Sequence, residues 1–272
     1  MTITTQKIAD KNTFFGELKN VLAAIEQDRK DIYFDGAGNA TTGIGFNLRT
    51  NDVVEIMITT MAEHNGVPAV KEPDDKGNVK TTYNGFELKD LNFAGDVKKA
   101  LTKSAETNVT STITTKWNEL RYKLSSDYDA KKANPHAGKA FDLEIYDGFT
   151  GDVFKNIAAD RLDQLDKQLA GDSYKDFNGE NYSYERLALL SMRYNSKKGA
   201  TDLIGDNLKE ALKEGDRFKA WFEIRHNSNG NNEAGLQKRR YYEAELFGLF
   251  NERDKPTDEE IKHILDTLPQ KV

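Results

Sequence analysis

Residues 26–45 read EQDRKDIYFDGAGNATTGIG, and this stretch decides the expected fold. The dipeptides Asp-Gly at 35–36 and Gly-Asn at 38–39 are strong turn signals. The segments on either side of them are rich in β-branched and aromatic residues, which favour strands. Residues 31–48 are therefore predicted to form a tight β-hairpin whose turn carries Asp35.

The segment before the hairpin predicts a helix over residues 13–28, with Thr13 as its N-cap. Its apolar side chains recur at helical spacing: Phe15, Leu18, Val21, Leu22 and Ile25. Glu26 comes close to the end of this helix, and Asp35 lies in the hairpin turn. Two carboxylates placed in this way, across a groove, are the arrangement that acid-catalysed hydrolysis of a glycosidic bond requires.

The spacing of these groups resembles a known catalytic signature. Glu26 is followed after eight residues by Asp35, after five more by Thr41, and then by Gly-Ile-Gly at 43–45. This pattern is similar to that of the phage-type lysozymes, glycoside hydrolase family twenty-four.

The resemblance implies a role for each of three residues. Glu26 would be the general acid that protonates the leaving glycosidic oxygen. Asp35 would stay ionised, stabilise the oxocarbenium-like transition state and orient the attacking water, which Thr41 would hold. A water between carboxylate and sugar implies inversion at the anomeric carbon, with carboxyl groups about 6.5–9.5 Å apart. Without the resemblance, the three residues have ordinary alternatives: a surface Glu near a helix end, a turn-forming Asp and a β-branched strand residue.

Four further hairpin residues are candidates for contact with substrate. Tyr33 and Phe46 would either pack against sugar rings or fill the core of the hairpin. Gly43 and Gly45 would serve backbone geometry and the close approach of substrate. The chain departs from the family at Phe46, where histidine is usual, and at Thr42, where an aliphatic residue is usual.

The segment GLQKRRYYEAELFGLF at 235–250 predicts a helix and resembles the Gly-Leu-x-x-Arg-Arg-x-x-Glu element of related phage muramidases. The resemblance implies that Arg239 or Arg240 pairs with Glu26 or lines the cleft, without indicating which of the two does so. The alternative for both arginines is a solvated helix face.

The expected fold is α+β and mainly α-helical: a two-lobed lysozyme-like fold with a small β-hairpin lobe and a larger helical lobe around a cleft. Residues 1–272 would be a single lysozyme-like domain, with 13–65 as first helix and hairpin lobe, 66–145 as an insertion and 146–272 as the helical lobe. Residues 67–85 hold two prolines and several turn signals, which predict an exposed excursion. Further helices are predicted over 51–64, 88–101, 112–133, 149–169, 182–195, 203–215, 217–226, 235–250 and 258–268.

The composition narrows the classes of partner. The net charge of −6 argues against nucleic acid as the main partner. Attraction to anionic peptidoglycan would then depend on a local basic patch at 238–240 or 197–198. No apolar run reaches the roughly 18 residues of a membrane span. The chain has no cysteine, and its four histidines lack metal-ligand spacing, so no disulfide, metal or cofactor is expected.

The function that the resemblance implies is that of a muramidase. Such a peptidoglycan hydrolase cleaves the β-1,4 bond between N-acetylmuramic acid and N-acetylglucosamine and lyses the cell wall, as a phage endolysin or an antibacterial effector. Residues 1–12 lack the basic start and apolar core of a Sec signal peptide, so delivery to the periplasm by a holin or a secretion apparatus is expected. An effector would have an immunity protein as a partner. The alternative is a non-catalytic peptidoglycan-binding or phage structural module with the same fold.

Overall fold

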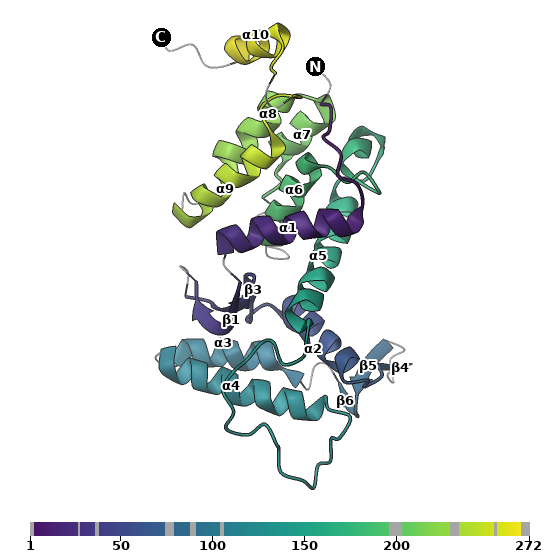
Figure 1. Cartoon of the computed structure of the whole chain (residues 1–272), viewed down its shortest axis with the longest axis vertical. Coiled ribbons are helices and arrows are strands. Elements are labelled where there is room, and N and C mark those ends of the chain that lie inside the picture. Colours follow the sequence, from purple (N-terminus) through teal and green to yellow (C-terminus); the bar gives the residue numbers. More distant parts are fainter. Residues whose placement is uncertain are drawn as a thin grey trace. The chain divides into compact units, whose positions relative to one another are not determined.

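The computed structural model describes residues 3–26, 28–35, 38–73, 79–87, 91–103, 106–195, 203–228, 234–252 and 255–267. The chain forms two compact units: unit 1 comprises residues 1–21 and 158–272, and unit 2 comprises residues 22–157. The structure is mainly helical with two small antiparallel sheets of three strands each, which confirms the predicted α+β, mainly helical class (Figure 1). Among the described residues, no helix combines the length and apolar character needed to cross a membrane.

The predicted hairpin is present in unit 2 as part of a three-stranded sheet. Strand β1 (Arg29–Phe34) pairs with β2 (Ala40–Gly43), which pairs with β3 (Phe46–Asn47). Asp35 lies in the turn between β1 and β2, as predicted. Its backbone N–H donates to the carbonyl oxygen of Asn39 at 3.0 Å, which closes the turn.

Helix α1 (Lys11–Glu26) leads into this sheet and confirms the predicted first helix. The predicted N-cap, Thr13, is wrong, because Asp10 has that role. The Asp10 carboxylate accepts the backbone N–H groups of Asn12 at 2.7 Å and Thr13 at 3.0 Å. A carboxylate at a helix start satisfies free N–H groups and also interacts favourably with the helix dipole.

The other predicted helices are present, and most bounds agree within a few residues. They are α2 (Asn51–His64), α3 (Phe93–Lys103), α4 (Glu106–Lys123), α5 (Phe149–Gln168), α6 (Tyr184–Asn195), α7 (Asp206–Glu214), α8 (Arg217–Phe222), α9 (Ala234–Phe247) and α10 (Asp258–Thr267). The largest difference is at the end of α4, which was predicted to reach residue 133. Beyond it the side chains of Ser125 and Asp129 accept backbone N–H groups two residues later, and such turns compete with the helix.

The region 66–145 contains a second sheet that the sequence analysis missed. Strands β4 (Val70–Pro73), β5 (Val79–Tyr83) and β6 (Phe86–Glu87) pair antiparallel. The predicted exposure of 67–85 is confirmed for β4, which is exposed throughout, and for the Val79 side chain, which is 71% exposed, but it is wrong for Tyr83 of β5, which is 3% exposed. Because β4 is exposed at every position, it shows none of the alternation that identifies a half-buried strand.

The core of unit 2 is an aromatic cluster around Trp117 of α4. Its ring centroid lies 5.9 Å from that of Phe93 on α3, 5.4 Å from Phe141 and 6.4 Å from Phe149 on α5. The indole N–H donates to the carbonyl oxygen of Asp142 at 3.1 Å. Much of this cluster comes from region 66–145, so that region builds the core of the unit.

Unit 1 is organised around α6, in which residues 185–192 are all buried. A helix buried on every side is normally apolar, and the charges that this one carries are paired. Glu185 Oε1 lies 2.8 Å from Arg217 Nη2 on α8, and Arg186 Nη2 lies 2.6 Å from Asp166 Oδ1 on α5. Helix α9 packs along α6.

Candidate functional site

The first candidate residue, Glu26, lies beside the turn between β2 and β3. It is the last residue of α1. Gly45 in that turn has a positive φ of 71°, and a Cβ built on it would lie 3.5 Å from Glu26 Cγ and 3.6 Å from Glu26 Cδ. The end of the helix and the second turn of the sheet therefore meet at the Glu26 carboxyl group.

The second candidate, Asp35, is held by its own turn. Its Oδ1 accepts the backbone N–H of Asn39 at 2.7 Å, and its Oδ2 accepts the Asn39 side-chain amide at 2.8 Å. Arg49 Nη1 in turn donates to Asn39 Oδ1 at 2.6 Å. A carboxylate has about four lone-pair sites, so Asp35 is fixed in orientation while keeping capacity to accept from water.

The third candidate, Thr41, joins the same network. It lies on β2 opposite Tyr33 of β1 and is 4% exposed. Its hydroxyl donates to the backbone carbonyl of Asn39 at 3.1 Å, which leaves the hydroxyl oxygen able to accept. Asp35 and Thr41 are therefore both oriented through Asn39.

The charges of both carboxylates, Glu26 and Asp35, act on the side chain of Tyr33. The pKa of the Tyr33 hydroxyl is raised to about 12, chiefly by burial and then by the negative charge of Glu26, with a smaller contribution from Asp35; the backbone of Gly45 and the guanidinium of Arg29 offset part of the shift. Within the described residues the hydroxyl makes no well-formed hydrogen bond. The half-buried Tyr33 thus lies within electrostatic reach of both carboxylates.

This shift predicts a pH dependence. The phenol has a pKa near 10 in an unfolded chain and about 12 in the folded protein. The folded state therefore gains stability from Tyr33 that is complete below about pH 10 and is lost as the pH rises through 12. In a spectrophotometric titration, the phenolate absorbance of wild type and Tyr33→Phe should superimpose up to about pH 11. An excess of phenolate in wild type near pH 10 would contradict the assignment.

Gly43 and Phe46 serve the packing of the sheet. Gly43 has a φ of 56°, and a Cβ on it would lie 2.5 Å from the Phe46 ring, which needs the space. Phe46 is 1% exposed. Of the two alternatives for Phe46, the structure therefore shows the core position and no surface for a sugar ring. The space beside Gly43 is filled by Phe46, which corrects the expectation that it admits substrate.

Arg239 and Arg240 are buried side chains of unit 1. They are 2% and 0% exposed, so the alternative of a solvated helix face is wrong. Both pair with Glu243 on the same helix: Arg239 Nε lies 3.2 Å from Oε1, and Arg240 Nη2 lies 2.8 Å from Oε2. Ser191 of α6 donates to Glu243 Oε1 at 2.7 Å. The two arginines form part of a buried charge cluster in unit 1.

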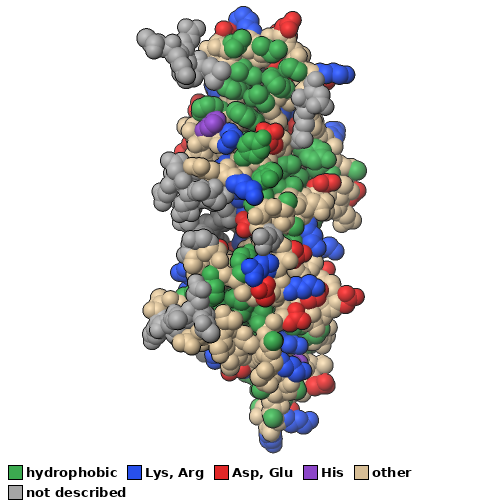
Figure 2. Space-filling view, turned by 60° about the vertical axis from the view of Figure 1, so that its left-hand side comes forward, with side chains coloured by type: hydrophobic (Ala, Val, Ile, Leu, Met, Phe, Trp, Pro, Cys, Tyr) green, Lys and Arg blue, Asp and Glu red, His purple; other side chains and the backbone are tan. Residues whose placement is uncertain are grey.

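The surface charge is mixed. Acidic and basic side chains are interspersed over the face that Figure 2 displays. The predicted basic patch at 238–240 is wrong as a surface feature, because only Lys238 of the three is exposed. The other predicted patch, 197–198, lies outside the described residues.

Asn39 and Arg49 were not among the predicted site residues. Asn39 was taken only as a turn residue, and Arg49 follows the hairpin without any motif of its own. Asn39 is nevertheless 6% exposed and makes hydrogen bonds with Asp35, Thr41 and Arg49. The one available signal was its position within a turn between two candidate catalytic residues, since Asn side chains commonly bond to nearby backbone and side-chain groups.

Comparisons of the chain with protein-family models, curated proteins and solved structures found no match.

Proposed function

We propose that the protein is a muramidase that hydrolyses the β-1,4 bond between N-acetylmuramic acid and N-acetylglucosamine in peptidoglycan. The observation that carries the proposal is the hairpin itself. It places Glu26 and Asp35 within electrostatic reach of one tyrosine, Tyr33, and fixes Asp35 and Thr41 through one asparagine. These are the three residues that the sequence pattern singles out, and the two carboxylates are the groups that glycoside hydrolysis uses.

In the proposed mechanism the two carboxyl groups have different tasks. Glu26 donates its proton to the glycosidic oxygen as the bond to the anomeric carbon breaks. Asp35 acts as the carboxylate base, and the two hydrogen bonds that it accepts from Asn39 hold it in orientation. It stabilises the positive charge that develops on the sugar ring and accepts the proton of the attacking water, which the Thr41 hydroxyl orients. Attack from the face opposite the leaving group gives inversion of configuration.

The biological setting belongs to the same proposal. The protein acts on the wall in the periplasm, as an endolysin released through a holin or as an effector that a secretion apparatus delivers. In the second case its partner is an immunity protein of the producing cell. The lysozyme-like arrangement of two lobes around a cleft is also part of the proposal.

The test is release of reducing ends from purified peptidoglycan by the wild-type protein, with the anomeric configuration of the product followed by NMR. Release with inversion supports a muramidase of the proposed mechanism, and release with retention refutes the role of Asp35. Binding of peptidoglycan without release refutes the enzyme and favours the non-catalytic wall-binding module.

Asn39→Ala should lower the hydrolysis rate about ten- to a hundredfold. The substitution removes the amide hydrogen bond to a charged Asp35 oxygen and the anchor that Arg49 provides, and hydrogen bonds to charged groups contribute about 1.5–3 kcal/mol. Reducing-end release measures the effect. Asn20→Ala, at an exposed position of α1, is the control. An Asn39→Ala enzyme as fast as wild type would show that Asp35 needs no such support.

A further inference from the structure

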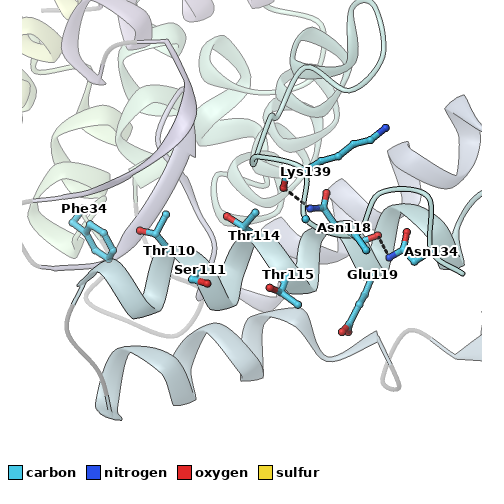
Figure 3. A pocket seen from close by; sticks show the side chains of 11 residues that line it. Phe34, Thr110, Ser111, Thr114, Thr115, Asn118, Glu119, Asn134 and Lys139 are labelled. Atoms are coloured by element: carbon cyan, nitrogen blue, oxygen red, sulfur yellow. Dashed lines mark hydrogen bonds between the residues drawn. The ribbon is translucent and has the colours of Figure 1, made fainter.

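A groove of about 860 Å³ runs along α4 in unit 2 (Figure 3). Phe34, the last residue of β1, lies at one end of it, and Thr110 and Thr114 of α4 follow along its floor. Asn134 and Lys139 on the loop after α4 lie toward the other end. Because Phe34 directly precedes Asp35 in the chain, the groove begins beside the candidate catalytic turn.

The floor of the groove is made of uncharged polar groups. Thr110 and Thr114 are four residues apart and so share one face of α4, beside the buried stripe of Val109, Ile113 and Trp117. Threonine is a mediocre helix former, and Lys or Glu would stabilise an exposed helix face better. A row of hydroxyls and methyls on this face is therefore not explained by helix stability.

Asn118 provides a second and independent sign of a ligand. The residue lines the groove but is only 2% exposed. Its side-chain amide donates to the carbonyl oxygen of Lys139 at 2.7 Å, and its own backbone carbonyl accepts from Asn134 at 3.1 Å. Its Oδ1, in contrast, has no hydrogen-bond partner among the described residues. Buried acceptors are nearly always satisfied, so this oxygen, in a residue that lines the groove, is an acceptor that the protein itself leaves unmatched.

We propose that this groove binds a stretch of peptidoglycan glycan strand next to the bond that is cut. The inference rests on the proposed function, to which it adds a binding site formed by region 66–145. Sugar hydroxyls and N-acetyl amides match the hydroxyl and amide groups of the floor, and the apolar face of a sugar ring matches the Phe34 ring. Lys139 has no ion-pair partner among the described residues. Its ammonium group suits the carboxylates of the lactyl and peptide substituents on the glycan strand.

The size and charge of the groove fit this ligand class. Thr110 and Asn118 are eight residues apart on one helix, a rise of about 12 Å, which is long enough for a short run of sugars. A nucleic acid would require several cations along its backbone. Glu119 also lines the groove and carries a charge opposite to that of Lys139. Its Oε2 lies 3.0 Å from Nζ of Lys116, so this charge is paired.

The test compares two groove variants with a control on the same helix. Thr110→Ala/Thr114→Ala removes two hydroxyls, and Thr114→Trp fills the groove. Thr112→Ala is the control, because Thr112 bonds to its own helix at Asn108 and does not line the groove. The KM for purified glycan strands should rise about tenfold in both groove variants, as the loss of one or two hydrogen bonds predicts, with a smaller change in kcat. The control should keep the wild-type KM.

These measurements distinguish failure of the groove site from failure of the muramidase activity. If wild type hydrolyses the strands and both groove variants keep its KM, the groove site is wrong and the muramidase stands. If wild type hydrolyses nothing, calorimetric titration of the same strands decides the groove. Binding that weakens about tenfold in the groove variants then supports the groove site on its own. Absent binding, or binding that the groove variants leave unchanged, overturns it.

Discussion

Glu26→Gln should lower the release of reducing ends from peptidoglycan by a factor of about a hundred to ten thousand, because a glutamine has no proton to donate to the leaving oxygen. The fold should remain intact. Glu26 is the terminal residue of α1 and is partly exposed, and the amide is nearly isosteric with the carboxyl group beside Gly45. The loss should appear in kcat more than in KM, since the proton transfer occurs only in the transition state.

The matched control is Glu17→Gln, on the same helix and also partly exposed, but nine residues before Glu26. It should keep the wild-type rate. Asp35→Asn should be as inactive as Glu26→Gln, because the base that activates water is lost. Circular dichroism of all three variants separates loss of chemistry from loss of fold. A Glu26→Gln protein that clears cell walls at the wild-type rate would exclude Glu26 as the acid.

Glu243→Gln should destabilise unit 1 by about 3–5 kcal/mol, the usual result of removing one partner of a buried ion pair. Glu243 is 0% exposed and lies between Arg239 and Arg240, which are also buried. Burial lowers the pKa of Arg240 to about 10 despite the favourable charge of Glu243, so its charged form is costly even in the native cluster. Without that carboxylate, the two buried guanidinium groups would lose the counter-ion that they share.

Each unit contains one tryptophan, Trp117 in unit 2 and Trp221 in unit 1, which allows the units to be followed separately. In a Trp117→Phe background, the urea midpoint from Trp221 fluorescence should fall for Glu243→Gln. It should stay unchanged for Glu245→Gln, an exposed glutamate on the same helix. Equal midpoints for the two variants would mean that the cluster does not hold unit 1 together.

The parts of the fold with strong local signals were predictable from the sequence. The helix over 51–64 has an apolar face and ends at Asn65-Gly66, and the hairpin has turn residues that demand a chain reversal. The sheet β4–β6 was missed because β4 is exposed at every position and β6 has only two residues, so neither shows the alternation of a half-buried strand. Local signals fail where a strand is very short or has no buried face.

Of the candidate site, only the separation of its residues along the chain could be predicted. Glu26, Asp35 and Thr41 were identified from their separation along the chain, whereas Asn39 was recognised only through its hydrogen bonds. Arg239 or Arg240 was expected to pair with Glu26 or line the cleft because of the resemblance to phage muramidases, with a solvated helix face as the alternative for both. Their burial depends on Glu243 and Ser191, and the contact with Ser191 joins helices far apart in the sequence.

The aromatic cluster around Trp117 has a consequence for protein engineering. Region 66–145 resembles a removable insert in sequence, yet it provides the Trp117 ring that packs against Phe149 at the start of α5, and the Phe93 ring that packs against Trp117. A truncated version without it would expose that apolar surface to water and leave the hairpin without a folded support. Attempts to reduce the protein to a minimal catalytic fragment should therefore redesign this packing instead of deleting the segment.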